Sequence, residues 1–204
     1  MQSIQKIFDI LEALLGPNGC QWDKKQTLSN FPKYFLEETH EVVEAIDHLD
    51  NTSMMEEVGD LLFTLCFFAK LAENENRFSF DDMVFYVCEK MIRRHPHVFH
   101  EKQNLSKEEV ATLWKEIKQK EKPERKSVLD EIPKTLPTLM KIEKLLIRTM
   151  PKDSVKSTKS KDELQKNLED LLKEIVASKN SPEEMCRMIY SQLEKEIAGD
   201  DLKA

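Results

Sequence analysis

Five acidic side chains lie at helical spacing in two short stretches of the sequence. They are Glu37, Glu38 and Glu41 in the first stretch, and Glu57 and Asp60 in the second. Residues three or four positions apart share one helix face, so each stretch would stack its carboxylates on one side of a helix. The short segment between the two helices predicts an antiparallel pair, in which four or five carboxylates converge. Oxygen ligands in that number suit Mg²⁺, or Mn²⁺ as its substitute.

The same acids could form an ordinary solvated surface, because glutamate-rich helices are common and usually face water. Two features weigh against that alternative. Apolar residues flank the acids in both stretches, and Gly59 stands beside Asp60. A glycine inside a helix costs stability, and a close approach of two helices would explain it.

A basic group follows at the end of a predicted helix. Lys90 and Arg94 are four residues apart and share a face. Together they could grip phosphate oxygens, arginine through its planar fork and lysine as a point charge. The alternative is a basic last turn that complements the helix dipole, and the residues alone favour it somewhat. His95 and His97 have no third partner at metal-ligand spacing, so we expect them to hold the loop in place.

Two tryptophans offer weaker signals. Trp114 and Lys118 are one helical turn apart, so they could stack on a base and reach a phosphate. A core tryptophan beside a solvated lysine is an equally good interpretation. The loop around Gly19 and Trp22 matches no phosphate-binding glycine pattern, and there we expect a buried tryptophan.

The composition favours an all-α protein. The chain has 204 residues, only four of them glycine, and is rich in leucine, glutamate and lysine, which lose little rotamer freedom in a helix. Its net charge of −7 argues against binding a nucleic-acid polymer, which needs clustered positive charge. Four widely spaced cysteines fit a reduced compartment, and no apolar run is long enough for a membrane span. We therefore expect a cytoplasmic protein.

Helix start and stop signals divide the chain into helices, with no convincing strand alternation. Serine caps followed by glutamate three residues later open helices at Ser53, Ser106, Ser160 and Ser181. The expected helices cover 3–15, 32–50, 53–75, 79–94, 106–123, 138–150, 160–178 and a last one from 181. The predicted organisation is a catalytic helical domain over 1–122, a linker with a connecting helix over 123–160, and a helical hairpin over 161–204.

Taken in order, these strings resemble the MazG family. The matching blocks are 19–27, 36–42, 56–63, 93–99 and 114–118, and a further block over 130–140 extends the resemblance to about 1–145. The visible departure in the first block is Gln21, where the family usually has proline.

The resemblance implies an all-α antiparallel helical bundle, usually dimeric, that hydrolyses nucleoside triphosphates to monophosphate and pyrophosphate with Mg²⁺. It implies metal ligands at Glu38, Glu41, Glu57 and Asp60, with Glu37 as a supporting acid or a water-orienting base. It implies nucleotide and phosphate contacts at Lys90, Arg94, Trp114 and Lys118. Stacking on tryptophan tolerates any base, so we expect a housecleaning role toward non-standard nucleotides.

The last part of the chain resembles a degenerate copy of the acidic hairpin. Residues 182–190 can be laid on 56–63, and 166–170 on 37–41. Three of the acids are then missing, and cations stand in two of their places. We expect this segment to keep a helical hairpin but to bind no divalent ion.

Two alternatives stay open. One is a helical interaction or regulatory module without catalysis, although intact acids in the first half alone argue against it. The other is a related enzyme of narrow specificity, such as a dUTPase-like or phosphoribosyl-ATP-type pyrophosphohydrolase. The blocks over 19–23 and 94–99 favour the MazG family over these relatives.

Overall fold

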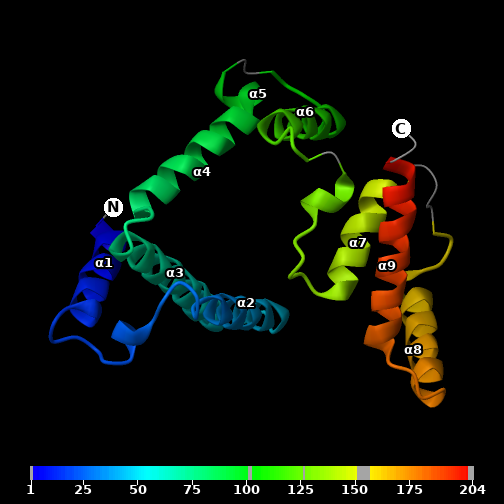
Figure 1. Cartoon of the computed structure of the whole chain (residues 1–204), viewed down its shortest axis with the longest axis horizontal. Coiled ribbons are helices and arrows are strands. Elements are labelled where there is room, and N and C mark those ends of the chain that lie inside the picture. The colour runs from blue at the N-terminus through cyan, green and yellow to red at the C-terminus, as the bar shows by residue number, and fades with distance from the viewer. Residues whose placement is uncertain (1, 101–102, 126, 151–156, 202–204) are drawn as a thin grey trace. The chain divides into compact units, whose positions relative to one another are not determined.

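Helices make up all the regular structure that the computed structural model describes, over residues 2–100, 103–125, 127–150 and 157–201 (Figure 1). The α-helices are α1 (Gln2–Leu15), α2 (Pro32–Asp47), α3 (Asn51–Asn74), α4 (Phe80–Arg94), α5 (Pro96–Phe99), α6 (Lys107–Glu121), α7 (Thr138–Thr149), α8 (Lys161–Ala177) and α9 (Pro182–Asp201). Two 3₁₀ helices are η1 (Asp23–Lys25) and η2 (Val128–Glu131). The predicted all-α class is confirmed.

The chain divides into two compact units, Met1–Ser106 and Lys107–Ala204. By its contacts α6 therefore groups with the second unit, whereas the sequence prediction joined it to a domain over 1–122. The domain assignment itself stays a prediction. Within the predicted 123–160 linker, residues 126 and 151–156 lie outside the described residues, as do 202–204 of the predicted hairpin.

An aromatic core holds the first unit together. Helix α1 turns its apolar face toward α3 and buries Leu11 completely against Phe31, Phe67 and Leu71. The rings of Phe31 and Phe67 lie 5.2 Å apart between centroids. Each buried side chain of this size contributes about 1.5–3 kcal/mol by leaving water. This packing fixes α3, which α1, α2 and α4 all contact.

Helices α2 and α3 form a tight hairpin. Leu49 has a positive φ of 54°, which reverses the chain directly after α2. Asp50 caps α3, since its carboxylate accepts hydrogen bonds from the Thr52 amide at 3.0 Å and the Ser53 hydroxyl at 2.7 Å. These bonds lower the pKa of Asp50. The predicted cap at Ser53 is wrong, because the aspartate satisfies the free amides three residues earlier.

Helix α4 begins at a strong cap and leaves the core. Ser79 and Asp82 form a reciprocal capping box, and the Phe8 and Phe80 rings meet edge to face at 5.0 Å. Beyond this start α4 runs away from the α2–α3 hairpin (Figure 1). The four-residue helix α5 was not predicted; Pro96 opens it where we expected only a stop.

The second unit is built around α7 and α9. Leu145 on α7 is completely buried, and the Thr138 hydroxyl donates a 2.6 Å hydrogen bond to Glu183 on α9. Ser160 and Glu163 form the predicted capping box of α8, which is confirmed. Helices α8 and α9 make the expected pair, but α9 packs mainly on α7, so descent from a second acidic hairpin stays a hypothesis.

None of the helices in the described part of the chain combines the length and the apolar character needed to cross a bilayer. All four cysteines are free, and burial raises the pKa of the Cys66 thiol. The cytoplasmic location stays a prediction from the cysteine spacing.

We expect Leu11→Ala to lower the free energy of unfolding by about 2–5 kcal/mol, because it opens a cavity in the closed aromatic core. The neighbouring Ile10 is 51% exposed on the same helix, so Ile10→Ala should cost about 0.5 kcal/mol or less. Urea unfolding followed by circular dichroism measures both. Equal losses would contradict the placement of α1 on α3.

Candidate metal centre

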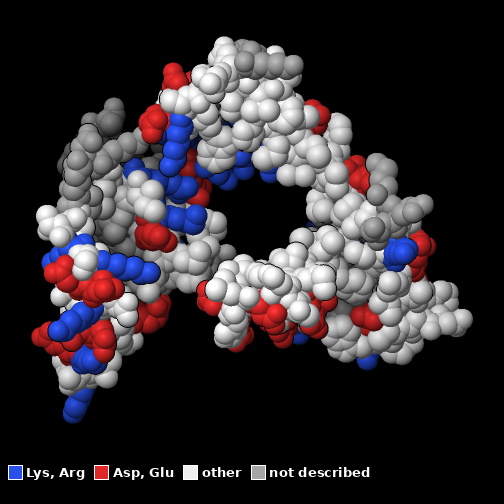
Figure 2. Space-filling model, turned by 180° about the vertical axis from the view of Figure 1, so that it is seen from behind, with Lys and Arg blue, Asp and Glu red and all other residues white. Residues whose placement is uncertain are grey.

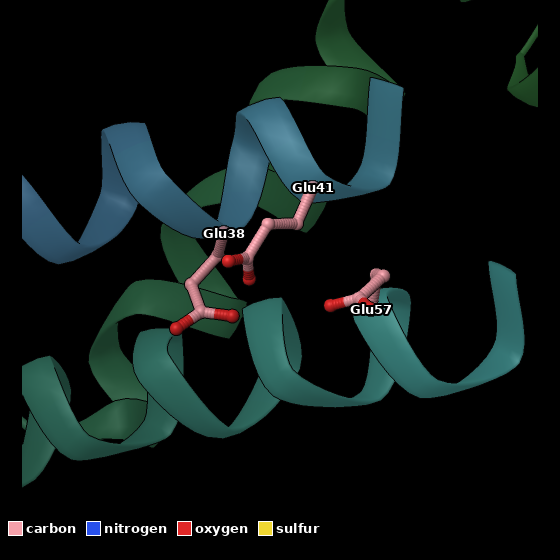
Figure 3. A group of neighbouring side chains, drawn as sticks. All are labelled: Glu38, Glu41 and Glu57. Atoms are coloured by element: carbon pink, nitrogen blue, oxygen red, sulfur yellow. The ribbon is translucent and has the colours of Figure 1, made fainter. Parts of the chain in front are cut away.

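Three carboxylates from two helices meet between α2 and α3. Glu38 and Glu41 project from α2, and Glu57 projects from α3 toward them (Figure 3). One oxygen of each lies within 4.8 Å of the others. The fold therefore brings together acids from both of the acidic stretches in the sequence.

The hairpin itself brings the acids together. Pro32 opens α2, Ala45 is buried near its end, and Thr64 is buried on α3. Glu38 and Glu41 are three residues apart, so they share a helix face and point toward the same part of α3. The antiparallel course of the two helices then places Glu57, near the start of α3, opposite this face.

The electrostatics of the cluster are repulsive. Burial raises the pKa of Glu38, and the charges of Glu41, Asp60, Glu37 and Glu57, in decreasing order, raise it further. Every charge that contributes to this shift is another carboxylate. Glu37 and Asp60 thus lie within electrostatic reach of Glu38, although they are not among the three residues whose oxygens converge.

The pKa of Glu57 on α3 is raised as well. Burial is the largest cause that raises its pKa, followed by the charges of Glu41, Glu56 and Asp60 and by a hydrogen bond with Glu41. In the space-filling view, acidic side chains gather over the α2–α3 hairpin, whereas the α8–α9 hairpin carries acids and bases intermixed (Figure 2). On this face the α2–α3 hairpin is thus more uniformly acidic than the α8–α9 hairpin.

The donor set fits a hard divalent cation. Carboxylate oxygens are the ligands that Mg²⁺ prefers, and two ligands on opposite sides of one Mg²⁺ are about 4.2 Å apart. The convergence within 4.8 Å is close to that spacing. A cation here would replace mutual repulsion of the acids with attraction.

Residues 26–99, which contain all of these acids, match the family model described as MazG nucleotide pyrophosphohydrolase domain. This chain belongs to the MazG family. It is 41% identical to the Nucleoside triphosphate pyrophosphohydrolase of Escherichia coli (strain K12), with 71% of this chain and 56% of that protein covered. It is 38% identical to the Nucleoside triphosphate pyrophosphohydrolase/pyrophosphatase MazG of Thermotoga maritima, with 66% of this chain and 52% of that protein covered.

A solved structure resembles part of this chain. It is the crystal structure of a mazG-related protein from Thermotoga maritima, with 29% identity, a TM-score of 0.50, and coverage of 56% of this chain and 98% of that chain. The chain spans about half the length of the two curated relatives named above.

Within the MazG-family match, the two predicted phosphate contacts lie on α4. Lys90 and Arg94 occupy its last two turns, far along the helix from Phe80, where α4 joins the core. Asp60 lies in the first half of α3, about 21 Å by helix rise from Asn74 at the end next to α4. Helix α4 diverges from the α2–α3 hairpin, so its last two turns lie away from the helices that carry the acids (Figure 1).

The other two predicted contacts lie on α6 of the second unit. Trp114 is 37% exposed, and the Lys118 ammonium lies 5.5 Å from the centre of its ring. The Lys118 side chain is 20% exposed and forms a 2.8 Å ion pair with Glu131. The alternative of a core tryptophan with a solvated lysine therefore does not describe this helix.

Two sequence interpretations need correction. Trp22, expected to be buried, is 58% exposed and meets the Tyr34 ring edge to face at 5.8 Å. The loop before Trp22 passes close to the end of α1 at Gly19, where a Cβ would lie 2.0 Å from the Leu14 carbonyl oxygen, so only glycine fits there. Gly59 was attributed to a close helix approach, but a Cβ on it would meet no described atom of this chain within 4 Å.

The histidines lie beside α5. His95 Nδ1 is 2.7 Å from the Met91 carbonyl oxygen, and its own carbonyl accepts from the Val98 amide at 2.9 Å. Both contacts fit the expected role of holding the loop. His97 Nδ1 is buried without a hydrogen-bond partner among the described residues.

We expect Glu38→Gln to raise the stability of the metal-free protein at pH 7 by about 0.5 kcal/mol, the usual scale of like-charge repulsion on a helix. The raised pKa of Glu38 means that the folded state binds this proton more tightly than the unfolded state. Stability from this group is therefore lost as the pH rises from the ordinary value of 4.5 through the raised value. Thermal unfolding in EDTA measures the effect.

The same variant should lose most of the stabilisation that Mg²⁺ gives the wild type, since a ligand is removed. Glu44→Gln, an exposed acid further along α2, serves as the control. A wild type whose unfolding temperature does not respond to Mg²⁺ would contradict the metal centre.

Proposed function

We propose that this chain hydrolyses nucleoside triphosphates to monophosphate and pyrophosphate with Mg²⁺, or with Mn²⁺ as a substitute. The observation that carries the proposal is the convergence of Glu38, Glu41 and Glu57 in a field made only by other carboxylates. Asp60 would complete the ligand set from α3, one turn after Glu57. Membership of the MazG family and the printed names of the relatives support the same reaction.

The chain's own residues would divide the work between metal and substrate. A bound divalent ion supplies charge neutralisation and a water of lowered pKa. Glu37, beside the ligands on α2, would orient that water or accept its proton. Lys90 and Arg94 would offset the negative charge that develops on the phosphate oxygens.

Base recognition would fall to α6. The indole of Trp114 can stack on any base, and Lys118 beside it can reach a phosphate oxygen. Stacking without directional hydrogen bonds gives little discrimination between bases. We therefore propose broad specificity and a housecleaning role toward non-standard nucleotides.

A homodimer would complete the site. Large apolar side chains remain exposed along the α2–α3 hairpin, among them Leu36, Val43, Ile46, Met55 and Val58. Large exposed apolar patches often mark protein interfaces. The open space above Gly59 fits the same interpretation, since a second copy could approach the helix closely there.

The dimer would also supply the missing cations. Because α4 leads Lys90 and Arg94 away from the acids of their own chain, we propose that they serve the acid cluster of the second copy. In a twofold dimer each site would then combine acids from one chain with cations from the other.

Asp60→Asn should lower pyrophosphate release by at least about 100-fold while leaving the helix content unchanged, because loss of a metal ligand costs at least as much as loss of its support. The assay uses standard and modified nucleoside triphosphates, each with Mg²⁺ and with EDTA. The ranking of the panel separates a broad enzyme from a dUTPase-like one.

Asp81→Asn, on the exposed first turn of α4, is the control and should retain full activity. An Asp60→Asn variant with unchanged turnover would contradict the assignment of Asp60 as a metal ligand. No release from any triphosphate by the wild type would instead favour an interaction module without catalysis.

Mixing inactive variants tests the shared site. Equal amounts of Asp60→Asn and Arg94→Ala chains, exchanged by mild denaturation, should recover about a quarter of the wild-type activity, because half of the dimers are mixed and each has one intact site of two. If acids and cations of one chain work together, the mixture stays inactive.

A further inference from the structure

Glu131 lies at the centre of a cationic group that joins three elements of the second unit. One oxygen of its carboxylate is 2.8 Å from the Lys118 ammonium of α6 and 3.3 Å from the Arg148 guanidinium of α7. The bond from Lys118 is the largest cause that lowers the pKa of Glu131, and Arg148 and Arg125 lower it further. The carboxylate is thus charged and well satisfied.

This group is better shielded than an ordinary surface pair. The side chains of Lys118 and Glu131 are 20% and 30% exposed, whereas those of Lys173 and Glu169 on α8 are 68% and 58% exposed. Exposed pairs of the second kind contribute little, because water and salt screen them. The Lys118–Glu131 pair keeps more of its attraction and so restrains the lysine.

Glu131 is the fixed member of the pair. It ends η2, which Ser127 and Asp130 cap reciprocally, and the next residue, Ile132, is buried. Lys118 is by contrast a long side chain that would otherwise sample many rotamers. The ion pair therefore fixes the lysine, and through the cation–ring contact it aligns the lysine with the indole of Trp114.

The pair leaves the lysine able to bind a second anion. An ammonium group has three donors, and the bond to Glu131 uses one of them. The Glu131 oxygen that Arg148 shares is the hydrogen-bond acceptor for this ammonium, so its other donors can face phosphate oxygens on a side chain that the pair already restrains. Fixing a binding group before the ligand arrives raises affinity, since the ordering cost does not fall on the binding step.

We propose that Glu131 is a positioning residue that holds Lys118 beside Trp114 in the arrangement in which α6 binds the nucleoside triphosphate. The inference rests on the proposed function, because it takes the ligand of α6 to be the nucleotide. It assigns to Glu131 an effect on nucleotide affinity and none on the chemical step.

The test compares Glu131→Gln, which keeps the shape and removes the charge, with wild type in ATP hydrolysis. KM should rise about threefold to tenfold, as expected for loss of a partly shielded ion pair, and kcat should change less than twofold. Glu169→Gln breaks the exposed pair of α8 and should leave both constants unchanged. A fall in KM would mean that Glu131 competes with the phosphate, and would overturn the inference.

A double variant shows whether Glu131 acts through the lysine. Lys118→Met alone should raise KM, and adding Glu131→Gln to it should raise KM no further. Independent, additive effects would overturn the inference, as would unchanged KM in Glu131→Gln. Circular dichroism of all variants excludes loss of the fold as the cause.

Failure of the proposed reaction gives a different result. If wild type releases no pyrophosphate, calorimetry with α,β-imido ATP replaces the kinetic assay. Weaker binding by Glu131→Gln than by wild type would then support the inference while the proposed hydrolysis fails. Equal or tighter binding, or no binding to wild type, would overturn it.

Discussion

Repulsion among carboxylates held between α2 and α3 is the constraint on which the rest of the first unit depends. Glu38, Glu41 and Glu57 converge although burial and their mutual charges disfavour their ionised forms. The hairpin can hold them there because apolar packing fixes α3 elsewhere, through Leu11 and the phenylalanine cluster. Stability is thus drawn from one end of α3, and charge is concentrated near the other.

The same arrangement explains why the hairpin looks incomplete by itself. Its apolar residues are only partly used in the core, and several large ones stay exposed. Its acids have no balancing cation among the charges that set their pKa. A divalent ion and a second copy of the chain would answer these two needs separately, one by neutralising the acids and the other by covering the apolar face.

The second unit uses its carboxylates in the opposite way. Glu131 has a lowered pKa because cations surround it, whereas Glu38 has a raised pKa because acids surround it. The first arrangement gives a satisfied contact that restrains side chains, and the second gives a repulsive cluster that a cation would stabilise. The residue type is the same, and the neighbours decide its role.

The sequence alone determined the longer helices, the capping box at Ser160 and the helical spacing of the acids, because these depend on residues within one or two turns. It did not determine the cap at Asp50, the exposure of Trp22 or the partner of Lys118. Glu131 is 13 residues from Lys118, and no local pattern marks such a contact. Only the tertiary structure decided which acids converge and in which direction α4 carries its cations. The angle at which α4 leaves the core follows from packing between helices and not from periodicity within one helix.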